Sequence, residues 1–442
     1  MSAWTTDPLT SPFDAAVEPP GSKSLTNRAL VLAALAAEPC TLENVLFADD
    51  TRHMLRNLQA LGLKLDIDEP GHRVCVDAPA SHDFAAEPAE LFCGNSGTTL
   101  RFLAALLAAV GDADFTLTGE PRMLERPIGP LADLLNALGA SVSFAQHAGY
   151  PPLVIHGRQL AGGTVRFPAE SAASSQYLSA VLMAAPYTRH ETHIHLEGRQ
   201  TSWSYVRMTM RLMDRFGVTP ELERDPATSV PTAVVVPRGR YHGVTCRIEP
   251  DASAASYFLG LAAIHPGSRV TILGLGEASL QGDAQFALVL RRMGCQVEQT
   301  ADSTTLTGPA QLHGLDVDLS DMPDVAQTLA VVALFAVGET TLRGIHTLRV
   351  KETDRIAALQ AELAKLGGET QLLGEGREVA LRITPPPRVR SGRIATYDDH
   401  RMAMSFALAA TRRRGIEIEN PACVSKTFPD YFEVLRRTAT VG

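Results

Sequence analysis

The sequence predicts an α/β protein of two similar domains, each built from three repeats. A helix that ends in a hydrophobic residue and glycine recurs at intervals of about 75 residues, closing at Gly62, Gly139, Gly217, Gly294 and Gly367. A short apolar strand precedes each of these helices, and a second row of helices follows the same period. A unit this small cannot close a large core alone, so the copies are expected to pack together.

The glycine-terminated helices have a simple local signature. Glycine adopts the left-handed conformation that ends many helices, and a strand is expected to follow each one. The strands before them close on Asn or Gly, in the segments 41–44, 116–119, 193–198, 270–274, 340–344 and 416–420. The last of these segments adds a sixth copy of the unit.

The second row of helices begins with small or polar residues and continues as an apolar run. Such starts combine N-cap chemistry with a core-facing helix. They are expected from Gly21, Gly94, Ser171, Asp251, Pro323 and Asp398. Six strand–helix–strand–helix copies divide naturally into three per domain, with the boundary in the Gly- and Arg-rich segment 237–243.

Bulk composition narrows the classes of function. The 442 residues suit two domains, and the net charge of -9 argues against nucleic acid or an anionic membrane surface as the main partner. No signal peptide and no apolar stretch long enough to span a membrane is evident. The six scattered cysteines form no C-x-x-C pair, which predicts reduced thiols in a cytoplasmic protein and neither a zinc site nor a disulfide framework. No H-E-x-x-H or EF-hand motif appears, so no metal or cofactor is expected.

Cationic and polar residues gather at the helix entrances, where helix dipoles and free N–H groups favour anions. The candidates are Lys23, Ser24, Arg28, Asn95, Gly97, Arg126, Ser174, Ser175, Gln176, Ser202, Tyr205, Asp324, Lys351, Glu352, Arg355, His400, Arg401 and Lys426. Each of them also fits an ordinary helix cap or a solvated surface position. If the entrances share a cleft, so many cations favour a pair of polyanionic substrates, because like charges without a ligand repel.

Several long segments resemble the EPSP synthase family of enolpyruvyl transferases (3-phosphoshikimate 1-carboxyvinyltransferases). They stand in the family's order along essentially the whole chain: 19–30, 91–101, 117–131, 173–180, 281–283, 349–356, 395–404 and 426–432. The resemblance implies an inside-out α/β barrel in each domain, three βαβαββ-type repeats per domain and an active site in the interdomain cleft. It also implies an N-terminal domain of residues 22–242 and a C-terminal domain of residues 1–21 plus 243–442.

The resemblance further implies transfer of the enolpyruvyl group of phosphoenolpyruvate to the 5-hydroxyl of shikimate 3-phosphate, by a monomer without cofactor or metal. Shikimate 3-phosphate would be held by Lys23, Ser24, Arg28, Ser174, Ser175, Gln176, Ser202, Tyr205, Asp324, Thr347 and Lys351. Phosphoenolpyruvate would be held by Lys23, Asn95, Gly97, Arg126, Gln176, Arg355, Arg401 and Lys426. The catalytic group would comprise Asp324 as proton acceptor, Glu352 with Lys23 as proton donor, and His400.

The sequence departs from the family pattern at three places. Thr347 stands where Asn is usual, Trp203-Ser204 replaces Lys-Pro, and Phe102 replaces a Pro. Two related alternatives are a UDP-N-acetylglucosamine enolpyruvyl transferase and a non-catalytic anion-binding relative. The first usually carries a reactive cysteine in the loop that corresponds to residues 119–129, and this chain has none there. An RNA-end-processing enzyme of similar repeats is a third alternative, which the acidic composition disfavours.

Overall fold

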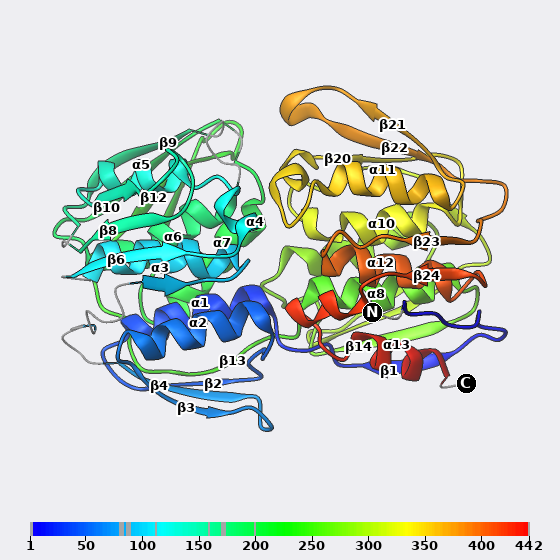
Figure 1. Ribbon diagram of the computed structural model, residues 1–442, viewed down its shortest axis with the longest axis horizontal. Helices are drawn as coiled ribbons and strands as arrows, with labels where there is room; N and C mark the ends of the chain where they lie inside the picture. The colour runs from blue at the N-terminus through cyan, green and yellow to red at the C-terminus, as the bar shows by residue number, and fades with distance from the viewer. Residues whose placement is uncertain are drawn as a thin grey trace. The chain divides into compact units, whose positions relative to one another are not determined.

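The computed structural model describes residues 3–78, 84, 90–110, 113–157, 160–168, 174–198 and 200–440. The chain divides into two compact units, one of Gly21–Ile248 and the other of Met1–Pro20 with Glu249–Gly442. Both units combine helices with small β-sheets (Figure 1). No helix among the described residues has the length and apolarity needed to cross a membrane.

The described part of Gly21–Ile248 contains three four-stranded sheets of one topology. In each sheet two strands pair in parallel, and two more extend the sheet antiparallel as a hairpin. The sheets are, in spatial order, β13 (Thr245–Arg247), β2 (Cys40–Glu43), β4 (Arg73–Asp77) and β3 (Lys64–Asp68); β5 (Glu90–Phe92), β6 (Asp114–Thr118), β8 (Leu153–His156) and β7 (Ser141–Phe144); and β9 (Gly163–Pro168), β10 (Thr192–Glu197), β12 (Pro231–Val236) and β11 (Glu221–Arg224).

The second unit repeats this topology twice and then shortens it. Its full sheets are β1 (Asp14–Val17), β14 (Arg269–Leu273), β16 (Ser303–Thr307) and β15 (Gln296–Gln299); and β18 (Asp316–Asp318), β20 (Thr340–Arg343), β22 (Ala380–Thr384) and β21 (Glu369–Leu373). The last repeat has only the parallel pair β23 (Gly392–Ile394) and β24 (Ile416–Ile418), followed by α13 (Tyr431–Thr440). A minor parallel pair joins β17 (Leu312–His313) to β19 (Ala336–Val337).

The first sheet of each unit takes its outer parallel strand from a distant part of the chain. β13 lies more than 200 residues after its partner β2, and β1 lies more than 250 residues before its partner β14. With these distant strands, each of the two sheets has the same four-strand topology as the other four-stranded sheets.

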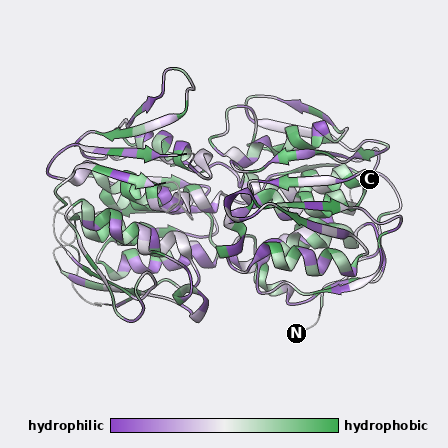
Figure 2. Ribbon diagram, turned by 90° about the horizontal axis from the view of Figure 1, so that it is seen from above, coloured by the Kyte–Doolittle hydropathy of each residue, from purple (hydrophilic) through white to green (hydrophobic). Residues whose placement is uncertain are grey.

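One helix of each repeat is almost entirely buried. These core helices are α1 (Lys23–Leu35), α3 (Gly97–Val110), α6 (Ser175–Ala184), α8 (Ala252–Ile264), α10 (Ala326–Ala333) and α12 (His400–Ala410). Their sequences are rich in Ala and Leu on every face, which is typical of helices buried all round. Figure 2 shows this hydrophobic character along helices inside each unit. α8, α10 and α12 contact one another pairwise, and α3 contacts both α1 and α6.

The other helix of each repeat is amphipathic or half exposed. These helices are α2 (Asp49–Ala60), α5 (Gly129–Ala137), α7 (Trp203–Arg215), α9 (Phe286–Arg292), α11 (Arg355–Lys365) and α13, with the short α4 (Pro121–Leu124) before α5. The five predicted glycines follow α2, α5, α7, α9 and α11 with φ between 88° and 113°. The predicted left-handed helix ends are therefore confirmed.

The predicted α/β class is confirmed, and the structure adds detail to the repeat. The strand–helix–strand–helix pattern omitted an antiparallel hairpin in every repeat but the last; with it, the order becomes βαβαββ. In the described part of the last repeat, the parallel pair β23 and β24 is followed by η7 (Pro421–Lys426) and α13 instead of a hairpin. The helix start expected at Ser171 lies outside the described residues, and α6 is described from Ser175.

Close packing of the three core helices in the second unit depends on Gly260. A Cβ at this position would lie 2.9 Å from Thr328 Cγ2 of α10 and 3.1 Å from Leu408 Cδ1 of α12. We expect Gly260→Val to lower the free energy of unfolding by about 1–3 kcal/mol, because overpacking forces the helices apart. Urea unfolding followed by circular dichroism measures the change.

Gly392→Ala is the matched control in the same unit. Its Cβ would come no closer than 3.6 Å to Lys365 Cβ, which is ordinary contact. An unfolding midpoint for Gly260→Val equal to that of this control would contradict the packing argument.

Candidate active site

The start of α1 presents a lysine that is held by a buried carboxylate. Ser22 caps the helix by accepting a hydrogen bond from the Leu25 N–H. Lys23 Nζ lies 3.1 Å from Oδ2 of Asp50, which stands in the first turn of α2 and is almost fully buried. Sequence reasoning singled out Lys23 and missed Asp50, because an acidic residue in a first helix turn is common and gives no separate signal.

Arg28 is a buried cation that joins three helices. Its guanidinium donates to Thr209 Oγ1 of α7 at 2.7 Å, to Ser179 Oγ of α6 at 3.3 Å and to the Ser24 carbonyl at 2.9 Å. Only 1% of Arg28 is exposed, and no carboxylate lies within 4 Å of it among the described residues. Burial lowers the pKa of Arg28 to about 10. A buried charge without a counter-ion is costly, so this position favours an anion.

Phe102 accounts for one departure from the family pattern. Its fully buried ring lies 5.1 Å from the Arg28 guanidinium carbon and supports the cation by a cation–π contact.

The entrance of α3 brings a glycine against two arginines. A Cβ on Gly97 would lie 2.9 Å from Arg126 Nη2 and 3.0 Å from Arg101 Nη1. Arg126 donates to the carbonyl and the side-chain oxygen of Asn95, both at 3.2 Å, and Arg101 donates to Gln176 Oε1 at 2.6 Å. The structure thus brings Asn95, Gly97, Arg126 and Gln176 together as expected neighbours, with Arg101 as an addition that sequence reasoning did not select.

Hydroxyl groups complete the cluster in Gly21–Ile248. Ser174 caps α6 through the Gln176 N–H at 3.2 Å, and Ser175 follows in the first turn. Ser202 is the buried N-cap residue of α7 and has φ 54°, a left-handed conformation that a serine adopts only under local constraint. Tyr205 N–H donates to the Ser202 carbonyl, and its own carbonyl accepts from the Thr209 hydroxyl that Arg28 also contacts.

In the second unit, Asp324 is surrounded by three cations. It lies in the short 3₁₀ helix η4 (Pro323–Val325) that leads into α10. Arg401 Nη2 is 2.8 Å from its Oδ2, while Arg355 Nη1 and Lys351 Nζ are 3.3 and 3.6 Å from its Oδ1. Burial opposes ionisation, but the charges of Arg401, Lys351 and Arg355 outweigh it and hold the pKa of Asp324 well below its ordinary value.

Arg355 connects this carboxylate to two others. Its guanidinium binds Asp399 through Nε at 2.7 Å and Nη2 at 3.2 Å, and Nη2 also lies 2.7 Å from Glu352 Oε2. Glu352 in turn lies 3.8 Å from Nζ of Lys426, at the end of η7 (Pro421–Lys426). The predicted Asp324, Glu352, Lys351, Arg355, Arg401 and Lys426 therefore form one cluster, with Asp399 as a member that sequence reasoning missed.

His400 and Thr347 occupy enclosed positions beside this cluster. His400 is the first residue of α12, is fully buried, and has Nδ1 3.7 Å from Asp399 Oδ1. Thr347 lies in η5 (His346–Val350), just before Lys351, and its buried hydroxyl has no hydrogen-bond partner among the described residues. His400 therefore lies beside Asp399, and Thr347 is enclosed next to Lys351.

Asp283 is a further buried carboxyl that sequence reasoning did not select. It lies in η3 (Gly282–Gln285) and accepts a hydrogen bond from the Ser253 hydroxyl of α8. Burial, followed by the negative charge of Asp324, raises the pKa of Asp283 to about 7. Its proton therefore responds to the charge of the Asp324 cluster.

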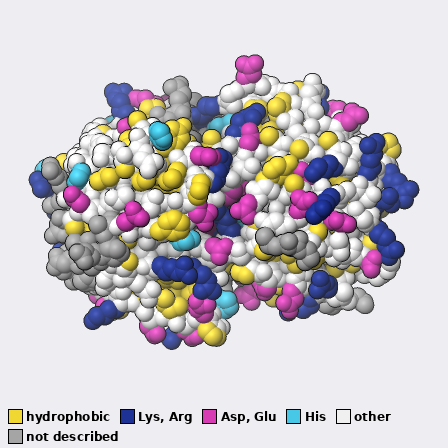
Figure 3. Space-filling view, viewed as in Figure 1, with side chains coloured by type: hydrophobic (Ala, Val, Ile, Leu, Met, Phe, Trp, Pro, Cys, Tyr) yellow, Lys and Arg dark blue, Asp and Glu magenta, His cyan; other side chains and the backbone are white. Residues whose placement is uncertain are grey.

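Both clusters suit anions that carry several charges. Arginine and lysine side chains at helix entrances bind phosphate and carboxylate groups, and the adjoining carboxylates can exchange protons. In the part of the chain that the structure describes, no group of three or more His, Cys, Asp or Glu side chains is arranged to hold a metal ion. Acidic and basic side chains are interspersed on the face shown in Figure 3.

Comparisons with known proteins agree with this chemistry. The sequence profile described as EPSP synthase (3-phosphoshikimate 1-carboxyvinyltransferase) matches residues 9–435. A 3-phosphoshikimate 1-carboxyvinyltransferase of Aliivibrio salmonicida is 44% identical over 440 residues, which cover 99% of each chain. One of Shewanella loihica is 45% identical, covering 93% of this chain and 94% of the relative.

A solved structure supports the same assignment. The EPSP synthase of Acinetobacter baumannii superposes with a TM-score of 0.79 at 26% identity, covering 99% of this chain and 98% of that chain. The family match spans nearly the whole sequence, and it includes the helix entrances that carry both clusters. This chain therefore belongs to the EPSP synthase family, the 3-phosphoshikimate 1-carboxyvinyltransferases.

Proposed function

We propose that this enzyme transfers the enolpyruvyl group of phosphoenolpyruvate to the 5-hydroxyl of shikimate 3-phosphate, releasing phosphate. The observation that carries the proposal is the cluster around Asp324, in which proton-accepting carboxylates stand among four cations. Both proposed substrates are small polyanions, and each has a phosphate group that these cations can bind. A monomeric state and a cytoplasmic location remain predictions.

The proposed chemistry divides proton transfer between two carboxyl groups. Asp324 accepts the proton of the attacking hydroxyl while Glu352, with Lys23, supplies a proton to the methylene carbon of phosphoenolpyruvate. The hydroxyl oxygen then bonds to the adjacent carbon and gives a tetrahedral intermediate. Phosphate then leaves as its carbon–oxygen bond breaks and takes up the proton held by Asp324, while Glu352 takes back a proton from the methyl group, which forms the enolpyruvyl ether.

Ligand charge is expected to change the basicity of Asp324. Its neighbours Arg401, Lys351 and Arg355 hold the pKa of Asp324 low, which makes it a weak base. Anionic substrate groups that take over these cations would weaken their attraction for Asp324. Because an opposite charge nearby favours the ionised form, that loss raises the pKa of Asp324 toward the range useful for proton transfer.

Each proposed ligand draws its other contacts from both clusters. Lys23, Ser24, Arg28, Ser174, Ser175, Gln176, Ser202, Tyr205, Thr347 and Lys351 are proposed for shikimate 3-phosphate, and Lys23, Asn95, Gly97, Arg126, Gln176, Arg355, Arg401 and Lys426 for phosphoenolpyruvate. We propose a positioning role for His400, through Asp399, since its ring is fully buried.

Phosphate release by the purified protein tests the reaction directly. We expect release that requires both shikimate 3-phosphate and phosphoenolpyruvate, and none when UDP-N-acetylglucosamine replaces shikimate 3-phosphate. Release with the UDP-sugar would favour the related transferase. Binding of both ligands without any phosphate release would favour a non-catalytic relative.

Removal of a proposed proton-transfer group should slow the chemical step. We expect Asp324→Asn and Glu352→Gln each to lower kcat by about 10²–10⁴-fold, the usual contribution of general acid–base catalysis. Glu369→Gln, which changes an exposed carboxylate at the start of β21, is the control. A kcat for either site variant within about threefold of the control would refute its proton-transfer role.

Gly97→Ala should act mainly on phosphoenolpyruvate. The new methyl group would displace the guanidinium groups of Arg126 and Arg101 by a few tenths of an ångström. We expect KM for phosphoenolpyruvate to rise by about tenfold, while KM for shikimate 3-phosphate changes little. Equal increases in both KM values would show that the loop is not specific to one substrate.

A further inference from the structure

The turn that leads into α12 has a strained backbone. Tyr397 and Asp398 have φ of 54° and 55°, so two consecutive residues with side chains adopt the left-handed conformation. Such residues persist only where the surrounding contacts hold them. One contact is a hydrogen bond from Asn420 Nδ2 to Asp398 Oδ1 at 3.0 Å, in an exposed position. The next residue is Asp399, which caps α12 and binds Arg355, so the path of this turn places the Asp399 carboxylate.

A buried carboxylate holds the start of the turn. Glu362 of α11 is fully buried, and its Oε2 accepts from the Ala395 N–H at 3.1 Å while its Oε1 accepts from the Tyr397 hydroxyl at 2.7 Å. Burial, followed by this hydrogen bond, raises the pKa of Tyr397 to about 12, so its hydroxyl remains a donor. Lys365 Nζ lies 2.7 Å from Glu362 Oε2 and donates to the Arg393 carbonyl at 3.1 Å.

Glu362 and Arg355 act on the same segment from one helix. They stand at positions i and i+7 of α11, which is close to two helical turns, and therefore share a face of the helix. Arg355 binds Asp399 through Nε at 2.7 Å, and Glu362 binds residues 395 and 397. α11 thus holds the segment 395–399 near both of its ends.

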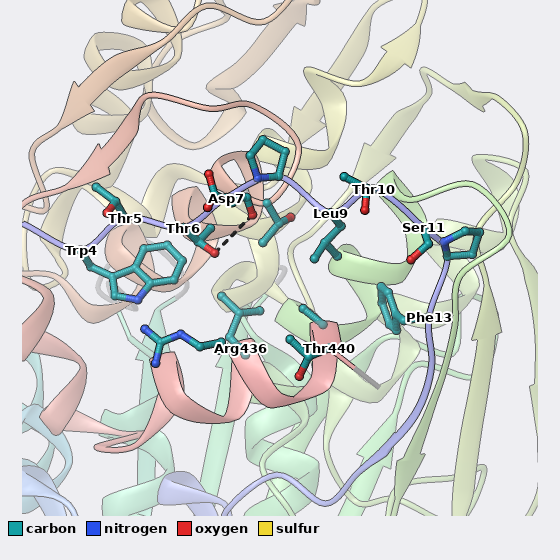
Figure 4. Close-up of a pocket in the computed structure, with 15 residues that line it drawn as sticks. Trp4, Thr5, Thr6, Asp7, Leu9, Thr10, Ser11, Phe13, Arg436 and Thr440 are labelled. Atoms are coloured by element: carbon teal, nitrogen blue, oxygen red, sulfur yellow. Dashed lines mark hydrogen bonds between the residues drawn. The ribbon is translucent and has the colours of Figure 1, made fainter. Parts of the chain in front are cut away.

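The other end of α12 is held by different contacts. The carbonyl of its C-cap residue, Thr411, accepts from the Leu9 N–H at 2.8 Å, and Thr411 Oγ1 lies 2.9 Å from His265 Nε2. Figure 4 shows Leu9 in the N-terminal segment, which lines a pocket of about 520 Å³ together with part of α13. These contacts fix where α12 ends. Asp399 precedes the helix, so its carboxylate depends on the path of the turn.

The turn reaches the cluster around Asp324 through Asp399. This carboxylate accepts from the Arg401 N–H at 2.9 Å and pairs with Arg355, and Arg401 Nη2 lies 2.8 Å from Asp324 Oδ2. Arg355 and Arg401 are two of the cations proposed for phosphoenolpyruvate. A displacement of Asp399 would therefore disturb two contacts of the same substrate.

We propose that Glu362 is a positioning residue for phosphoenolpyruvate, which acts through the turn 397–398 on Asp399. This inference rests on the proposed function and adds a residue that touches neither substrate. A buried ion pair contributes little net stability, and the partner of Glu362, Lys365, has a side chain that is 42% exposed. The contribution of Glu362 is the conformation of the turn.

Glu362→Gln tests the role with little change of shape. The amide replaces one acceptor oxygen with an NH2 group, which cannot accept from the Ala395 N–H or from the Tyr397 hydroxyl. We expect KM for phosphoenolpyruvate to rise at least about fivefold and KM for shikimate 3-phosphate to change less than about twofold. Glu369→Gln, on an exposed carboxylate, is the control and should change neither. A loss of stability alone would reduce the active fraction, and so kcat, without separating the two KM values.

Tyr397→Phe is a milder variant of the same contact. Tyr397 is 43% exposed, so the loss of its hydroxyl should leave the fold intact. We expect KM for phosphoenolpyruvate to rise at least about twofold, and no change for Tyr150→Phe, an exposed tyrosine of the other unit. In the double variant with Glu362→Gln the amide no longer opposes a hydroxyl donor, so KM should be no higher than for Glu362→Gln alone.

Phosphate release by the wild-type enzyme separates the possible failures. An inactive wild type overturns the proposed function and this inference with it. With an active wild type, the positioning role alone is overturned by an unchanged KM for phosphoenolpyruvate in Glu362→Gln, by equal rises in both KM values, or by additive effects in the double variant. If Glu362→Gln does not fold, Tyr397→Phe decides by the same comparison of KM values.

Discussion

The ion pairs of Arg355 determine the arrangement of the cluster around Asp324. Its guanidinium is 1% exposed and contacts Asp399, Glu352 and Asp324, which belong to three different segments of the second unit. Taking these charges out of water is costly, and only good geometry with further hydrogen bonds offsets the cost. The contacts meet that requirement because Asp399 binds Nε and Nη2 together and also caps α12 through the Arg401 N–H. The Arg355 guanidinium thereby holds three carboxylates in place: Asp399 at the start of α12, Glu352, and the Oδ1 side of Asp324.

Arg28, a buried arginine of Gly21–Ile248, is surrounded by neutral groups where Arg355 is surrounded by carboxylates. It is as deeply buried as Arg355, yet its guanidinium contacts two hydroxyls, a carbonyl and the ring of Phe102. Neutral acceptors satisfy the geometry of the guanidinium without cancelling its charge. The remaining positive potential is available to an anionic ligand, whereas in the other cluster a ligand must compete with carboxylates already in place.

Much of the fold was predictable because each repeat is marked by residues whose effect on the backbone or on burial is local. Gly217 and Gly294 end helices through their own left-handed conformation. The core helices can be recognised from sequence by apolar residues on every face. The family resemblance implied the hairpins as part of βαβαββ repeats, but the residue pattern alone did not show them, because strands such as β3 and β11 are short, polar and largely exposed and leave no alternating pattern. The pairing of β1 with β14 and of β13 with β2 was not predictable from the repeat spacing, because the paired strands are more than 200 residues apart in sequence.

The candidate site divides in the same way. Cations at helix entrances were found from sequence, because a charge at a helix start is a local feature. Asp50, Asp399 and Asp283 were missed because each looks like an ordinary residue at a helix or turn until tertiary structure gives it a partner: Lys23, Arg355 and Ser253 respectively. Carboxylates that pair with cations, such as Asp50 and Asp399, do not themselves bind anions, so a pattern of anion-binding residues does not include them.

The capping residues of the core helices differ in charge between the two units. In Gly21–Ile248 the entrances of α1, α3 and α6 carry Ser22, Ser96 and Ser174, which accept backbone hydrogen bonds without charge. In the second unit Asp251 and Asp399 cap α8 and α12 by accepting backbone hydrogen bonds. Asp324 lies in η4 before α10, and the N-cap residue of α10 is Val325, which makes no side-chain capping hydrogen bond. Serine and aspartate serve equally as caps, so the repeat tolerates either. The choice changes the charge at the entrance. Ser22 adds no charge where α1 begins, whereas the Asp399 carboxylate both caps α12 and binds the guanidinium of Arg355. The cap of α12 thereby brings a negative charge into the cluster around Asp324.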